Sequence, residues 1–157
     1  MSDDVFMISE AASSVLLVGL ALIIGFAWMT VRTLRIPTAA PDRLVAELRL
    51  AQFGAVMLAL TAGASLGLTA ANDTRPGIAV EGAVALAFFA LATMAPLRDP
   101  REALTLLALA FGAHAVVDIS HRPGFLPDHL APQWFVVGCA IHNLCAGVLC
   151  YLPVLRR

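Results

Sequence analysis

The sequence predicts an all-α, polytopic membrane protein, and its composition, its apolar segments and its arginine distribution each support that fold class. Hydrophobic residues make up 60% of the 157 residues, charged residues only 13%, and the mean hydropathy is +0.86. A soluble domain is nearer half apolar and a quarter charged. Folded in water, this chain would expose large apolar patches. We therefore expect a single transmembrane domain over residues 1–157, with little mass outside the bilayer.

Five apolar segments are long enough to cross a bilayer, which requires about 20 mostly apolar residues in a helix. The first two segments carry no charged residue, and the third carries only Glu81. Prolines, glycines or an Asn-Asp pair separate the segments. We predict a bundle of five transmembrane helices at about residues 13–31, 50–71, 77–97, 101–121 and 132–155.

The arginines predict the orientation of this bundle, because cytoplasmic loops of membrane proteins carry an excess of positive charge. Eight of the ten arginines lie between the first and second segments, between the third and fourth, or at the C-terminus. Only Arg75 and Arg122 lie on the other side. We therefore expect an extracytoplasmic N-terminus and a cytoplasmic C-terminus in a bacterial inner membrane. Glu47, between Arg43 and Arg49, is expected to form an ion pair at the inner surface.

Charge and residue types exclude several function classes. The net charge of −1 argues against a nucleic-acid-binding face. All ten basic residues are arginine, and the absence of lysine excludes Schiff-base chemistry with retinal or pyridoxal phosphate. The sequence contains no Gly-x-Ser-x-Gly, P-loop or dinucleotide motif, so a serine hydrolase or a nucleotide-dependent enzyme is not expected.

The fourth segment carries the polar residues that point most clearly to a site. His114, Asp118 and His121 are spaced by four and three residues, which places them within roughly 60° of one helix face. Ionisable groups inside a span are costly and usually face an interior site or a water-filled cavity. In the predicted orientation, His142 and Glu81 lie in the same outer half of the bilayer.

Imidazole and carboxylate groups are the usual ligands of zinc, iron, copper and manganese. We therefore expect a metal site with His114, Asp118, His121 and His142 as ligands. Such a metal can activate water for hydrolysis. The corresponding enzyme hypothesis is a metal-dependent hydrolase acting on membrane lipid or another lipophilic substrate, with Glu81 or Asp128 as general base.

Two other function classes stay open, as does the question of whether the chain is an enzyme. His114 and His142 are also candidate axial ligands of a haem or chlorophyll in a redox or photosynthetic complex, because each follows a small residue by four positions. The chain can instead be a non-catalytic accessory subunit, with His114 and Asp118 simply pairing with each other. Cys139 and Cys145 flank His142 and are interpreted as packing residues rather than copper ligands.

Small residues recur every fourth position along the second segment, and such rows let transmembrane helices approach closely. They pack against the third segment within the monomer or dock another membrane subunit. The sequence does not separate these alternatives. The row consists of Ala51, Ala55, Ala59, Gly63, Gly67 and Ala71.

From about residue 107 to residue 152, the chain resembles a family of small multi-pass bacterial membrane proteins to which no activity is assigned. The motif that carries the resemblance is His114-x3-Asp118-x2-His121 followed by Gly124, with Gly138-Cys139 opening the last helix. The family often has a second histidine where this chain has Arg122. It often has aspartate at the positions of His142 or Asn143. The resemblance implies that the His-Asp-His face is a site and implies no particular chemistry.

Overall fold

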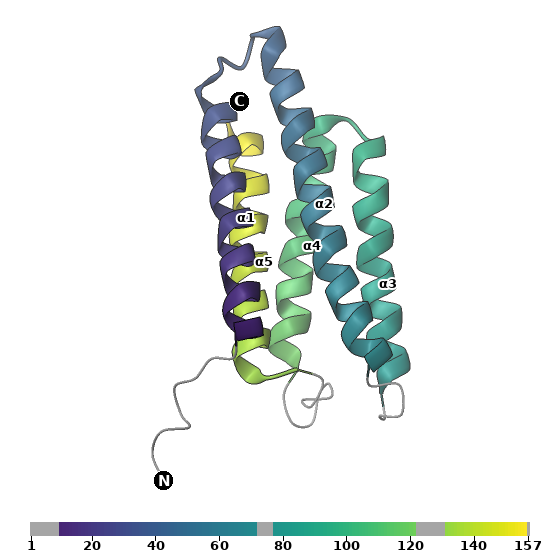
Figure 1. Cartoon of the computed structure of the whole chain (residues 1–157). Coiled ribbons are helices and arrows are strands. Elements are labelled where there is room, and N and C mark those ends of the chain that lie inside the picture. The colour runs from purple at the N-terminus through teal and green to yellow at the C-terminus, as the bar shows by residue number, and fades with distance from the viewer. Residues whose placement is uncertain (1–9, 72–76, 122–130, 157) are drawn as a thin grey trace.

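The computed structural model of the chain is an all-helical bundle (Figure 1), and it describes residues 10–71, 77–121 and 131–156. Its five long helices are each long and apolar enough to cross a membrane, which confirms the predicted number of candidate spans for these residues. A short 3₁₀ helix, η1 (Ala95–Leu97), follows α3, because Pro96 lacks the N–H that would extend the α-helix. The five helices are α1 (Glu10–Arg35), α2 (Pro41–Ala71), α3 (Ile78–Met94), α4 (Pro100–Ser120) and α5 (Gln133–Leu155).

Helix α2 packs against all four other long helices, and α4 packs against α2, α3 and α5 (Figure 1). Among the described helices, α1 packs only against α5 and α2. Leu58 of α2 and Leu104, Leu107 and Phe111 of α4 are fully buried at these contacts. Large apolar side chains such as Leu17 and Leu109 point outward instead, and each is more than 60% exposed. This pattern of apolar residues both inside and outside is typical of a bundle surrounded by lipid.

Helix α2 begins at Pro41, about nine residues before the predicted start at residue 50. The prediction was wrong here because it counted charge, and residues 41–49 include four charged side chains. Proline is well suited to the first position of a helix, and Asp42 complements the positive end of the helix dipole. Two of the charged side chains, Arg43 and Glu47, turn into the bundle.

Arg43 connects three helices at this end of the bundle. Its Nε donates to Glu47 Oε1 at 2.6 Å, while Nη1 donates to the carbonyls of Thr33 and Ile36 at 2.5 and 3.2 Å. Nη2 donates to the carbonyl of Pro153 at 3.3 Å. Arg101 reaches the other oxygen of Glu47 at 3.3 Å. The expected ion pair of Glu47 therefore exists, although both Arg43 and Glu47 are buried inside the protein.

Pro153 creates a second cross-link between α1 and α5. A proline inside a helix cannot donate to the carbonyl four residues earlier, which here belongs to Leu149. Thr30 of α1 donates its hydroxyl to this carbonyl at 3.3 Å. A neighbouring helix therefore supplies the donor that this carbonyl lacks within α5, as is common in membrane proteins.

The small residues of α2 divide into two groups. Ala51 and Ala55 are buried inside the bundle, whereas Gly63, Gly67 and Ala71 are exposed. A close helix contact outside this row occurs at Gly147 of α5, where an added Cβ would lie 3.2 Å from the backbone oxygen of Ala108 in α4. The predicted row therefore packs within the chain only over its first half.

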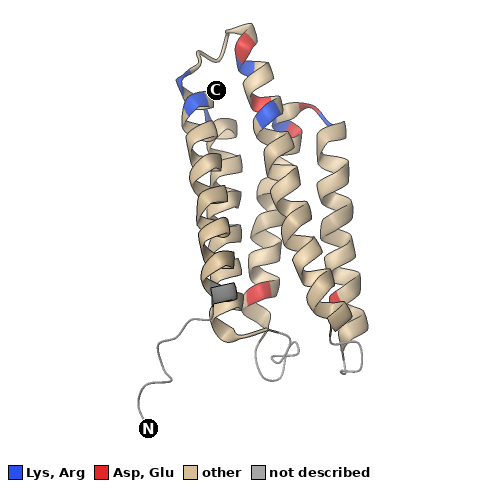
Figure 2. Cartoon of the chain, in the orientation of Figure 1, with Lys and Arg blue, Asp and Glu red and all other residues tan. Residues whose placement is uncertain are grey.

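The charged residues are distributed unevenly along the bundle (Figure 2). Every arginine that the structure describes lies at the end formed by the α1–α2 and α3–α4 connections and the C-terminus of α5. Acidic residues occur at both ends. Glu81 and Asp118 lie at the end opposite to the arginines, where the described chain has no basic side chain except histidine. We refer to the two ends as the arginine-rich end and the arginine-poor end.

Candidate functional site at the arginine-poor end

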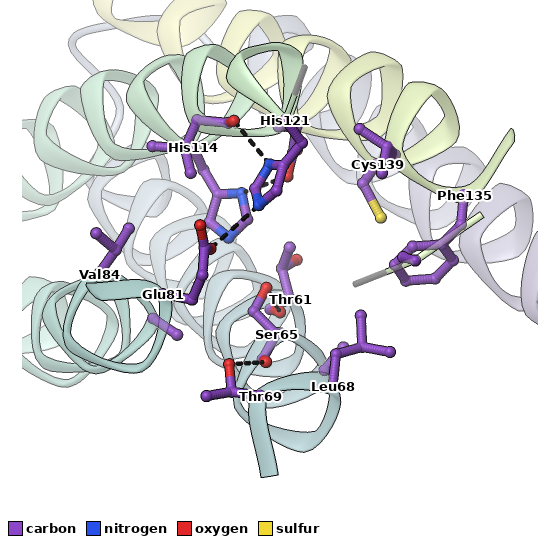
Figure 3. Close-up of a pocket in the computed structure, with 16 residues that line it drawn as sticks. Thr61, Ser65, Leu68, Thr69, Glu81, Val84, His114, His121, Phe135 and Cys139 are labelled. Carbon is purple, nitrogen blue, oxygen red and sulfur yellow. Dashed lines mark hydrogen bonds and ion pairs between the residues drawn. The ribbon is translucent and has the colours of Figure 1, made fainter. Parts of the chain in front are cut away.

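A cavity of about 60 Å³ lies between α2, α3, α4 and α5 at the arginine-poor end (Figure 3). This volume accommodates on the order of five water molecules. Its polar lining comes from the last turns of α4, the first turn of α3 and the second half of α2. The residues with polar side chains that line the cavity include Thr61, Ser65, Thr69, Glu81, His114, Asp118, His121 and Cys139.

Glu81 and His121 meet across this cavity, although they are 40 residues apart in the chain. His121 Nε2 lies 3.1 Å from Glu81 Oε2, and His121 Nδ1 lies 3.0 Å from the carbonyl oxygen of Val117. A carbonyl only accepts hydrogen bonds, so Nδ1 carries a hydrogen. The Nε2–Oε2 contact then holds one further proton, bound to either the imidazole or the carboxyl group. The second oxygen of Glu81, Oε1, is buried and has no hydrogen-bond partner within the part of the chain that the structure describes.

His114 and Asp118 form a second polar group together with Asn143 of α5. Asn143 Nδ2 donates to Asp118 Oδ2 at 2.8 Å and lies 3.1 Å from His114 Nδ1. His114 Nδ1 also lies 3.3 Å from Asp118 Oδ1. The imidazole can therefore accept from Asn143 or donate to Asp118, and in the second case its Nε2 carries a free lone pair.

Phe88 of α3 holds this imidazole in place, since the two ring centroids are 4.5 Å apart. His114 and Asp118 are each less than 10% exposed. The sequence spacing of four residues that suggested this pair is thus realised on one face of α4. Figure 3 shows the His114 ring lying beside His121 and Glu81, which brings the two polar groups to the same side of the cavity.

Three hydroxyl groups of α2 line the opposite wall. Thr61, Ser65 and Thr69 each donate to a backbone carbonyl one turn earlier, at 2.9, 3.3 and 2.8 Å. Because the hydrogens are used within the helix, these hydroxyls present their oxygen lone pairs to the cavity. Together with Glu81, they make the lining rich in hydrogen-bond acceptors.

The structure gathers only some of the predicted site residues. His114, Asp118, His121 and Glu81 line one cavity, but His142 faces α1, where its Nδ1 lies 3.8 Å from the position of a Cβ on Gly19. Asp128 lies outside the described residues. Within residues 10–71, 77–121 and 131–156, no three His, Cys, Asp or Glu side chains form a group that could hold a metal ion.

Sequence reasoning gave no role to several residues of the site. Asn143 occupies the buried position of α5, one residue beyond His142. Cys139, for which the sequence predicts only a packing role, lines the cavity. The row of hydroxyl residues on α2 could have been predicted, because Thr61, Ser65 and Thr69 recur at four-residue spacing in an uncharged segment.

Comparisons with protein families, with curated proteins and with solved structures found no match for this chain.

Proposed function

We propose that the chain is an integral protein of a bacterial inner membrane, with its N-terminus outside and its C-terminus in the cytoplasm. Five helices of spanning length support insertion. The clustering of the described arginines at one end supports the orientation, because positive charge is retained on the cytoplasmic side. A reporter fused to the C-terminus and active only outside the cytoplasm should be silent, and activity of that reporter would refute the orientation.

We propose further that the cavity at the arginine-poor end, and thus in the outer half of the bilayer, binds a cation. The observation that carries this proposal is the buried Oε1 of Glu81, which has no hydrogen-bond partner among the described residues, in a cavity that the hydroxyls of Thr61, Ser65 and Thr69 also line. A buried carboxylate oxygen without a donor costs free energy, and a bound cation removes that cost. No described arginine lies near enough to take this role.

A transition-metal ion is the cation that best fits the ligand types. Two atoms bound to one metal at about 2.0–2.2 Å lie roughly 3.0–3.5 Å apart, and Glu81 Oε2 and His121 Nε2 are separated by 3.1 Å. His114, whose ring lies beside His121 and Glu81, would be the third ligand. Asp118 would then orient His114 from behind through its Nδ1 rather than bind the metal itself. The ion would replace the proton that Glu81 and His121 now share, and a carboxylate that binds it through both oxygens would also use the unpartnered Oε1.

Elemental analysis of the purified protein tests this proposal. We expect about one zinc, iron, copper or manganese ion per chain in the wild type, and little in Glu81→Gln or His121→Ala. The matched control is His142→Ala, which should retain the metal because His142 faces α1. Metal loss in the control equal to that in the other variants would contradict the assignment of ligands. A folded, freshly extracted wild type without metal would refute the metal site.

Hydrolysis of a lipid or lipophilic substrate is the activity we propose for such a site. A metal there supplies a Lewis acid, and the outer half of the bilayer gives access to lipid. If Glu81 binds the metal, the role of general base passes to Asp128. Release of fatty acid from defined lipid vesicles by wild type, with loss in Asp128→Asn at unchanged metal content, would support this activity.

The two alternative functions, a haem- or chlorophyll-binding subunit and a non-catalytic accessory subunit, are tested by different measurements. A haem or chlorophyll between His114 and His142 is disfavoured by the small cavity and by the contact of His142 with α1, and a visible absorption band lost in His114→Ala would favour it. An accessory subunit would use the exposed part of the α2 row, Gly63, Gly67 and Ala71. Copurifying membrane proteins that are lost on Gly63→Leu would favour that class.

A further inference from the structure

A groove of about 470 Å³ lies at the arginine-rich end, between α1 and the start of α2. The groove is separate from the cavity described above and shares no residue with it. Its charged side chains are Arg32 of α1 and Asp42 and Arg49 of α2, and its exposed apolar side chains include Trp28 and Val45. We propose that this groove binds the phosphate headgroup of an anionic phospholipid.

The two arginines are available for a ligand. Among the residues that the structure describes, neither Arg32 nor Arg49 lies within 4.0 Å of a carboxylate oxygen, whereas Arg43 and Arg101 are both paired with Glu47. Two arginines and one aspartate leave the groove with a net charge of about +1, which matches a phosphodiester with one negative charge. An adjoining hollow lined by Trp28, Arg32 and Arg35 adds a further positive charge.

Trp28 gives the groove a preformed geometry. The guanidinium carbon of Arg32 lies 5.3 Å from the centroid of the Trp28 ring, which is a cation–π arrangement. This contact limits the rotamers of Arg32 before any ligand binds, so less side-chain entropy is lost on binding. Trp28 is itself 61% exposed, as expected for a ring at the level of the lipid headgroups.

The apolar surroundings identify a lipid rather than a free anion as the ligand. Val31 of α1 and Val45 of α2 are about half exposed beside the groove, and Ile24 continues the exposed apolar face of α1 toward the middle of the bundle. In a membrane, acyl chains would lie along this face while the headgroup enters the groove. Basic pockets between transmembrane helices on the cytoplasmic side bind acidic headgroups in this way.

Native mass spectrometry of the full chain in detergent tests the proposal, with phosphatidylglycerol as the probe and phosphatidylcholine as the neutral comparison. A direct contact between an arginine of this open groove and the phosphate contributes about a fivefold factor in affinity. We therefore expect the double variant that combines Arg32→Gln with Arg49→Gln to weaken phosphatidylglycerol binding about 30-fold. Arg98→Gln is the matched control: Arg98 is exposed at the same end, lines a different hollow and should change the affinity less than twofold.

A second variant separates a built site from general attraction by charge. Trp28→Leu keeps the net charge but removes the ring beneath Arg32, so it should weaken binding several-fold. Equal loss in Arg98→Gln and in the double variant, or equal binding of phosphatidylcholine, would overturn the proposal. Displacement of phosphatidylglycerol by inorganic phosphate at tenfold excess would also overturn it, because the ligand would then be a free anion. Far-ultraviolet circular dichroism checks that each variant is folded.

Discussion

Replacing Glu47 by glutamine should destabilise the bundle severely, because it leaves the charge of Arg43 buried without its counterion. Arg43 is 2% exposed and Glu47 is 1% exposed. Removing one partner of a buried ion pair typically costs about 3–5 kcal/mol. The three carbonyls that accept from Arg43 remain after the substitution, so we expect the lower figure, about 3 kcal/mol. Total stabilities of proteins are about 5–15 kcal/mol.

This loss is measurable as a shift of the thermal midpoint in detergent, followed by circular dichroism at 222 nm. For a chain of this size, 1 kcal/mol corresponds to roughly 2–4 °C, so Glu47→Gln should lower the midpoint by about 6–12 °C. Glu102→Gln is the control, since its pair with Arg98 is long, at 3.9 Å, and both side chains are more than half exposed. Such a pair contributes almost nothing to stability. A midpoint for Glu47→Gln within 2 °C of that control would refute the reasoning.

Three further predictions follow from other contacts. Asn143→Leu should lower the free energy of unfolding by about 1–3 kcal/mol in denaturant titrations, because the buried carboxylate of Asp118 loses the hydrogen bond from the Asn143 amide. An unchanged free energy of unfolding would mean that this hydrogen bond does not stabilise the protein. Gly147→Val should cost about 1–3 kcal/mol from overpacking against α4, whereas Gly63→Val, with open space around it, should not; equal midpoints would contradict this helix contact. Thr30→Val should cost about 1 kcal/mol of stability in the wild type, because the Leu149 carbonyl loses its donor. In a Pro153→Ala background the cost should be smaller, because the backbone N–H of Ala at position 153 can donate to the same carbonyl. Additive effects in this double-mutant cycle would disprove the coupling.

The five helices could be predicted from sequence because a bilayer leaves few alternatives to long apolar helices. The early start of α2 could not be predicted, because the burial of Arg43 depends on carbonyls of Thr33 and Pro153, which lie ten residues before it and 110 residues after it. Composition within a window carries no information about such distant acceptors. The same limitation hid the inward position of Glu47.

The site was predictable where it lies on one helix and less so where helices meet. His114 and Asp118 share a face of α4 by their spacing alone. The sequence also placed Glu81 at the same end of the bundle but could not pair it with His121. On α5, the residue that points inward is Asn143 rather than His142. That helix is apolar on most of its faces, so its rotation about its own axis leaves little trace in the sequence.

The partners of Arg43 also constrain the order in which the protein can assemble. Its Nη2 donates to a carbonyl near the end of α5, and α1 packs against no helix other than α5 and α2. During synthesis of the membrane protein proposed above, the contacts of α1 with α5 can form only after the last helix has been made. The intermediate with four helices holds a guanidinium group and a hydroxyl whose acceptors on α5 have not yet been made. Chains truncated before α5 should accordingly be substrates for membrane quality-control proteases, even though each of their four long helices is apolar enough to span a membrane.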